Sequence, residues 1–133
     1  MNERAIRILG ATCKWTGRAL SLLLLVFWGL FFVEHMKEWF LRPHGPYPPA
    51  WVWRQQAFHF LMLVALGVAL RWDKLGALLL VLATAGFFGL MPRWNGFPWI
   101  AFLNLAPVVF FAVYWLTQRA APAAAEQGEA AAH

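Results

Sequence analysis

Few polar side chains interrupt the apolar stretches of this sequence, and those that do are of types that bind ligands or move protons. Histidine coordinates metals and titrates near neutral pH, carboxylates hold cations and protons, and amides both donate and accept hydrogen bonds. Polar groups within apolar helices by default mark function or a packing partner. We call this set the polar seam: its members are Glu34, His35, Glu38, Gln55, Gln56, His59 and Asn104, with Lys37 and Thr84 beside them.

The two central histidines of the polar seam are expected at matching depth. If one helix ends near residue 41 and the next begins near residue 52, His35 and His59 each lie roughly 10 Å inside, at 1.5 Å per residue. Thr84 and Asn104 come out at a similar depth on the following two helices. We therefore expect these four side chains to lie in one layer, with Gln55 and Gln56 on the same helix stripe as His59.

Several interpretations of the polar seam remain open. Its side chains could bond to one another and to the backbone, which would specify the packing of the helices. His35 and His59 could instead ligate haem b from adjacent helices, or one histidine could ligate the magnesium of a chlorophyll or bacteriochlorophyll. Alternatively, Glu34, Glu38 and the two histidines could form a titratable site for a proton, a cation or a metal ion, or the His and Gln side chains could hold a quinone headgroup.

The helices that position these residues are indicated by the spacing of charge. Residues 19–33, 55–70, 75–92 and 94–118 contain no Asp, Glu, Lys or Arg. The chain of 133 residues is 62% hydrophobic and only 13% charged, whereas soluble domains are about 25% charged. About 20 apolar residues make one helical crossing of a bilayer. The sequence predicts an all-α, integral membrane four-helix bundle of up-down-up-down topology, with spans at about 17–41, 52–71, 75–92 and 97–118.

The distribution of Lys and Arg predicts the orientation of the bundle. With four spans, both termini and the second loop share one side, and excess Lys and Arg mark the cytoplasmic side. Seven basic residues fall on that side and four on the other: Arg4, Arg7, Lys14, Arg18, Arg71, Lys74 and Arg119 against Lys37, Arg42, Arg54 and Arg93. We expect a bacterial inner-membrane protein with both termini in the cytoplasm. Because the cations flank the spans, membrane topology accounts for them without a nucleic-acid partner.

The two ends of the chain differ from the spans in composition. Residues 1–16 combine Ile and Leu with Arg and Lys, which predicts an amphipathic segment on the cytoplasmic surface. Residues 120–133 are rich in Ala and poor in apolar bulk, which predicts a flexible tail. Within the spans, Asn104 is expected to satisfy the backbone break made by Pro107. Glycines are expected to mark close contacts between helices: Gly29, Gly67, Gly76, Gly86 and Gly89.

The sequence carries no motif of a self-contained enzyme. Phosphate-binding loops, nucleophile elbows and His-Glu-x-x-His pairs are missing from it, and the single Cys13 excludes an internal disulfide. We expect an accessory subunit of a larger energy-converting complex, respiratory or photosynthetic, whose partners are the lipid bilayer and other membrane subunits. The alternative is an independent oligomeric transporter or channel that uses Glu34, His35, Glu38 and His59.

Overall fold

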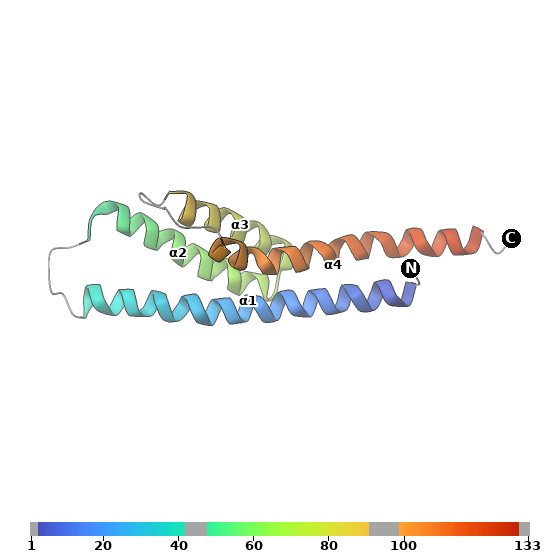
Figure 1. The fold of residues 1–133 in the computed structure, drawn as a ribbon, viewed down its shortest axis with the longest axis horizontal. Coiled ribbons are helices and arrows are strands. Elements are labelled where there is room, and N and C mark those ends of the chain that lie inside the picture. The colour runs from blue at the N-terminus through green and yellow to red at the C-terminus, as the bar shows by residue number, and fades with distance from the viewer. Residues whose placement is uncertain (1–2, 42–47, 91–98, 131–133) are drawn as a thin grey trace.

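The computed structural model describes residues 3–41, 48–90 and 99–130, the last ten of them as backbone. These residues form four helices and no strand, as the sequence predicts. Consecutive helices run antiparallel, and the start of the first lies at the same end of the molecule as the end of the last (Figure 1). The helices are α1 (Glu3–Phe40), α2 (Ala50–Ala69), α3 (Asp73–Gly89) and α4 (Trp99–Ala130).

Two long and two short helices pack as a ring. α1 packs against α4 and α2, and α3 packs against α2 and α4. Because α1 and α4 have 38 and 32 residues while α2 and α3 have 20 and 17, the long pair continues past the turn between α2 and α3 (Figure 1). We call the part of α1 and α4 that reaches and passes this turn, residues 3–17 and 111–120, the two-helix extension; at its inner end Phe111 still packs with Ala69 of α2 and Ala77 of α3. The remainder is the four-helix region.

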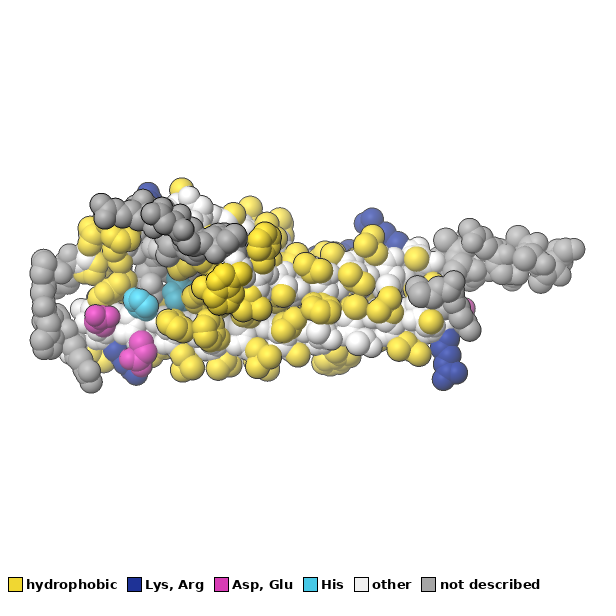
Figure 2. Space-filling model, viewed as in Figure 1, with side chains coloured by type: hydrophobic (Ala, Val, Ile, Leu, Met, Phe, Trp, Pro, Cys, Tyr) yellow, Lys and Arg dark blue, Asp and Glu magenta, His cyan; other side chains and the backbone are white. Residues whose placement is uncertain are grey.

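Apolar side chains cover the outside of the molecule more than they fill its inside. The main buried cluster contains Met62, Leu66 and Leu80 together with small alanines. Many large apolar side chains are exposed, including Leu23 at 66% and Phe102 at 69%, and hydrophobic side chains lie over the middle of the face shown in Figure 2. Two helices, α1 and the part of α4 up to Ala120, are long and apolar enough to cross a membrane.

Both ends of the chain are helical where the structure describes them, and their predicted interfacial and flexible character stays a prediction. The segment predicted to be separate and interfacial forms, from residue 3 on, the first turns of α1 without a break. The segment predicted to be a flexible tail continues α4 as far as Ala130. Alanine has the highest helix propensity, so an Ala-rich sequence extends a helix without packing partners. Residues 42–47 and 91–98, which include most of the two loops expected between the spans, and the last three residues lie outside the described residues.

Close contacts are found at two of the five glycines that were predicted to make them. A Cβ at Gly76 would collide with the backbone of Ala69, and one at Gly86 would collide with the ring of Phe58. The positions Gly29, Gly67 and Gly89 have open space instead. The contact that the sequence analysis missed is in the two-helix extension, where a Cβ at Gly17 would lie 2.8 Å from Phe111. Its neighbour along the same face, Gly10, would meet Thr117 at 2.5 Å.

Candidate functional site

The centre of the four-helix region is held by a buried asparagine that bonds to all three other helices. Asn104 of α4 is fully buried. Its Nδ2 donates to Thr84 Oγ1 of α3 at 2.6 Å and to Met62 Sδ of α2 at 2.9 Å. Its Oδ1 accepts the indole N–H of Trp28 of α1 at 3.1 Å. Both amide donors and the amide oxygen are therefore satisfied, as a buried polar group requires.

This arrangement corrects the expectation for Asn104. The side chain does not turn back to its own helix at the backbone break of Pro107; its hydrogen bonds go to the three neighbouring helices. α4 remains a helix through Pro107. The physical reason is that a buried amide at the centre of a ring of helices has closer partners across the ring than along its own axis.

His59 is joined to this centre through the backbone of Trp28. Its Nε2 lies 3.1 Å from the Trp28 carbonyl oxygen, and because a carbonyl only accepts, Nε2 carries the proton. The imidazole is 4% exposed. Three aromatic rings surround it with centroids 5.4 to 5.5 Å away, those of Trp28, Phe32 and Phe87. This packing fixes the ring and its tautomer.

His35 lies elsewhere, on the surface of α1. Its Nδ1 donates to the carbonyl oxygen of Phe31 at 2.7 Å, and its ring packs edge-on against Trp39 with centroids 5.8 Å apart. Trp28 and Asn104 are hydrogen-bonded and so lie at about the same level of the bundle. His35 lies two helical turns further along α1, roughly 10 Å, whereas α4 extends only about 7 Å from Asn104 in that direction. His35 has therefore passed the first residue of α4. One buried and one exposed imidazole give no support to haem held between the pair.

The charged members of the polar seam also lie outside the bundle. Glu34, Lys37 and Glu38 are exposed near the end of α1, and the Lys37 ammonium lies 2.8 Å from Glu34. Carboxylate and imidazole groups gather at this end of the molecule (Figure 2). Among the residues that the structure describes, no three His, Cys, Asp or Glu side chains are placed to hold a metal ion. The predicted four-residue titratable cluster is thus divided between the surface and the interior.

The two glutamines are buried at the start of α2. Gln55 and Gln56 are 8% and 9% exposed. The amide nitrogen of Gln55 donates to the backbone carbonyl of Phe87 on α3. In the described structure, Gln55 Oε1 and Gln56 Nε2 have no hydrogen-bond partner. Gln55 therefore connects α2 to α3, and each glutamine keeps one buried polar atom without a hydrogen bond to the described residues.

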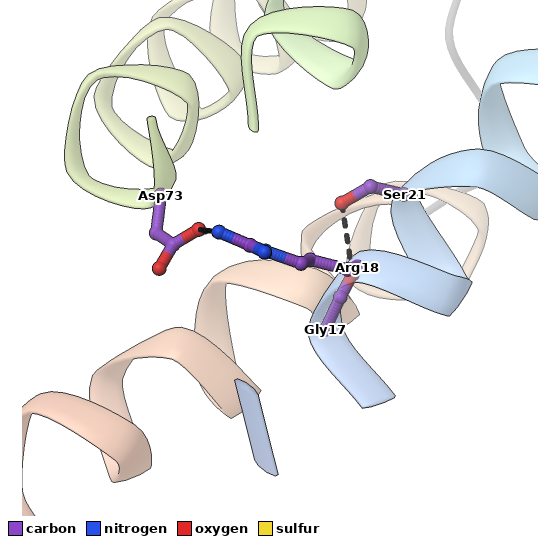
Figure 3. Close-up of polar contacts among 4 residues, drawn as sticks. All are labelled: Gly17, Arg18, Ser21 and Asp73. Atoms are coloured by element: carbon purple, nitrogen blue, oxygen red, sulfur yellow. Dashed lines mark hydrogen bonds and ion pairs between the residues drawn. The ribbon is translucent and has the colours of Figure 1, made fainter. Parts of the chain in front are cut away.

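An ion pair that was not predicted from the sequence lies at the boundary between the four-helix region and the two-helix extension. Arg18 of α1 donates from Nη2 to Asp73 Oδ1 of α3 at 3.0 Å, and its side chain is 24% exposed against 11% for Asp73 (Figure 3). Beside it, the buried Ser21 hydroxyl donates to the Gly17 carbonyl at 2.9 Å. The sequence did contain a sign of this pair, because the predicted topology places Arg18 and the loop next to Asp73 on the same side of the membrane.

Sequence analysis also missed Trp28 as a member of the centre. It stands well inside an apolar stretch, unlike the other eight tryptophans, which lie near expected helix ends. That position was the signal. An indole N–H deep in an apolar helix needs an acceptor, and Asn104 supplies it.

Comparison with known proteins gives a family but no activity. A family model described as a domain of unknown function (DUF7670) matches residues 2–123. The chain belongs to this family. Neither a curated protein nor a solved structure gives a significant match.

Proposed function

We propose that this member of the DUF7670 family is an integral membrane protein that crosses the bilayer four times and serves as an accessory subunit of a larger bacterial inner-membrane complex. Its role is to pack against partner subunits and lipid rather than to catalyse a reaction. The respiratory or photosynthetic class of that complex is carried by the sequence-based expectation alone.

The observation that carries the proposal is the inverted distribution of polarity. Of the residues in the most apolar stretch of α1 only 6% are buried, and in that of α4 28% are buried. The core helix of a soluble protein would bury such a stretch, whereas a hydrocarbon environment covers it from outside. Meanwhile Asn104, Thr84 and His59 are at most 4% exposed. Apolar groups outside and bonded polar groups inside are what the bilayer favours.

The two shorter helices fit four crossings in the same way. α2 has 20 residues and α3 has 17, or about 30 and 26 Å at 1.5 Å per residue, against a hydrocarbon core of roughly 30 Å. The uncharged polar residues of α2, Gln55, Gln56 and His59, are buried, and its one charged residue, Arg54, lies exposed near the start of the helix. The exposed side of α3 is apolar, with Leu75, Leu78 and Leu82 between 48% and 59% exposed.

The saturated centre favours an accessory role over a transporter. A transporter needs polar groups that can exchange partners with a substrate along a path through the bundle. Asn104 has its amide groups bonded to three helices, and His59 is enclosed by rings. Toward the two-helix extension the centre is closed by Leu66, Leu80 and Phe111, which are fully buried.

A blue-native gel of mildly solubilised membranes tests the accessory role. We expect the chain in a band much larger than its own mass, together with other membrane proteins. An absorbance spectrum of that band tests whether the complex carries haem or chlorophyll. A small homo-oligomer without other proteins would contradict the accessory role and favour the transporter alternative.

A further inference from the structure

A ledge forms where the short helices end against the side of the long ones. Residues 70–72 connect α2 to α3, and α3 begins at Asp73, which is paired with Arg18 of α1 (Figure 3). The two-helix extension continues past this level (Figure 1). The turn and the flank of the extension therefore meet at an inside corner whose two walls come from different parts of the chain.

Both walls of this corner carry cations. Lys14 lies one helical turn before Arg18 on the same face of α1, and so lies beyond the first residue of α3. Arg71 on the turn and Lys74 in the first turn of α3 are exposed, on either side of Asp73. Four cations less one carboxylate leave three positive charges. We call these four residues, Lys14, Arg18, Arg71 and Lys74, the basic corner.

The start of α3 adds to the positive potential of the basic corner. The first-turn N–H groups of a helix lack partners within the helix and carry a partial positive charge. Trp72, at the N-cap position of α3, gives them no side-chain hydrogen bond. These N–H groups, like the four cations, favour an anion such as a phosphate group.

Apolar groups on both sides of the basic corner fit a lipid rather than a free anion. Trp15 and Trp72 are 67% and 61% exposed, as indole rings are at the level of lipid headgroups. Leu75, Leu78 and Leu82 are exposed along one stripe of α3 that starts at the corner. An acyl chain can follow this stripe while its phosphate remains at the start of α3.

We propose that the basic corner binds the phosphate headgroup of an anionic phospholipid in the cytoplasmic leaflet. Basic sites between helices on that side of a membrane are suited to such headgroups. This inference rests on the proposed membrane insertion and on the orientation that places both termini in the cytoplasm. In this role Asp73 positions Arg18 and so holds the two walls together.

Native mass spectrometry of the full chain in mild detergent tests the proposal. The probes are dioleoyl phosphatidylglycerol and dioleoyl phosphatidylcholine, which differ only in the headgroup. We expect the first molecule of phosphatidylglycerol that binds to a chain to bind more tightly than the first molecule of phosphatidylcholine. Because each surface cation contributes roughly fivefold to anionic-lipid binding, the double variant Arg71→Gln, Lys74→Gln should lose about 30-fold of that preference.

The other end of the molecule supplies a matched control. Lys37→Gln with Arg54→Gln also removes two exposed cations, and it should keep the preference for phosphatidylglycerol. Equal binding of the two lipids by the unaltered chain, or an equal loss in the control, would overturn the proposal. Displacement of phosphatidylglycerol by millimolar glycerol 3-phosphate would overturn the assignment to lipid in favour of a soluble phosphate compound.

Carbonate extraction of the same membranes separates this inference from the proposed function. A chain released by carbonate would contradict the proposed membrane insertion itself. A chain that stays in the membrane but shows no lipid preference would contradict the basic corner alone.

Discussion

The four-helix region and the two-helix extension are held together by different chemistry. In the four-helix region, Asn104 links four helices through side-chain hydrogen bonds. In the two-helix extension, side chains of α4 pack directly on glycines of α1: Thr117 on Gly10 and Phe111 on Gly17. Hydrogen bonds between polar side chains therefore determine the packing in the first region. In the second region the packing depends on glycines, whose lack of a side chain leaves room for the side chains of α4.

The difference follows from how many helices surround each position. At the centre of a ring of four helices, a buried amide has donors and acceptors on several sides, and each bond excludes other rotations of the helices. A pair of helices offers one interface only, so close packing of small residues is the available source of attraction when lipid is as apolar as the helices. The comparison predicts that loss of a polar side chain lowers stability most in the four-helix region, and that an added methyl group lowers it most in the two-helix extension.

The largest effect is expected at the centre of the four-helix region. Asn104→Leu removes the partner of the Trp28 indole and of the Thr84 hydroxyl, so two buried polar groups lose a hydrogen bond. We expect a loss of about 2 kcal/mol in the free energy of unfolding. The measurement is denaturant unfolding in detergent, followed by circular dichroism.

The exposed Gln118 of α4 provides the control for this prediction. Gln118→Leu makes the same kind of change outside the network and should alter stability by less than about 0.5 kcal/mol. Equal effects of the two substitutions would show that the network does not stabilise the bundle.

Smaller effects are expected at two glycines of α1, Gly17 in the two-helix extension and Gly29 in the four-helix region, which should respond with opposite sign. Alanine at Gly29 meets open space, and it should stabilise α1 by up to about 1 kcal/mol through helix propensity. Alanine at Gly17 would place a methyl group 2.8 Å from the buried ring of Phe111. We expect Gly17→Ala to be less stable than Gly29→Ala by about 2 kcal/mol, because overpacking outweighs propensity.

The buried Cys13 reports on the same change locally. It lies on the face of α1 that also carries Gly10 and Gly17, so separation of the extension exposes its thiol. Alkylation should be faster in Gly17→Ala and unchanged in Gly29→Ala. Unchanged alkylation in both variants would contradict close packing of the extension.

The smallest effect is expected at the boundary between the two regions. A double-mutant cycle of Arg18→Gln and Asp73→Asn should give a coupling energy of about 1 kcal/mol, because the pair is largely buried. The exposed pair of Glu34 and Lys37, with side chains 72% and 53% exposed, should give about 0.3 kcal/mol or less. A boundary pair no stronger than the surface pair would contradict its role in joining the regions.

The helices could be predicted from the sequence because the signal is local. Stretches without charge give the number of helices and their order, and short loops make neighbours antiparallel. The helix ends are less well determined, because Gly10 and Gly17 do not interrupt α1 and alanines extend α4. Helix propensity accounts for helical backbone at both ends, and the predictions of an interfacial segment and a flexible tail stay predictions.

The candidate site could be predicted only in part, because depth follows from counting residues whereas contact depends on helix length and stagger. Thr84 and Asn104 were expected in one layer and are hydrogen-bonded. His35 was expected beside them and is exposed, because the first residue of α4 does not extend as far as the level of His35. The partners Met62 and Trp28 belong to residue types that are abundant in apolar helices, so their types alone do not mark them as hydrogen-bonding groups.

Single-cysteine labelling tests the central proposal of four membrane crossings most directly. In a Cys13→Ser background, Trp51→Cys at the start of α2 and Lys74→Cys at the start of α3 are both exposed positions. A membrane-impermeant maleimide added to intact cells should label Trp51→Cys only, and added to inverted membrane vesicles it should label Lys74→Cys only. Labelling of both positions from the same side would show that α2 does not cross the membrane and would contradict the account.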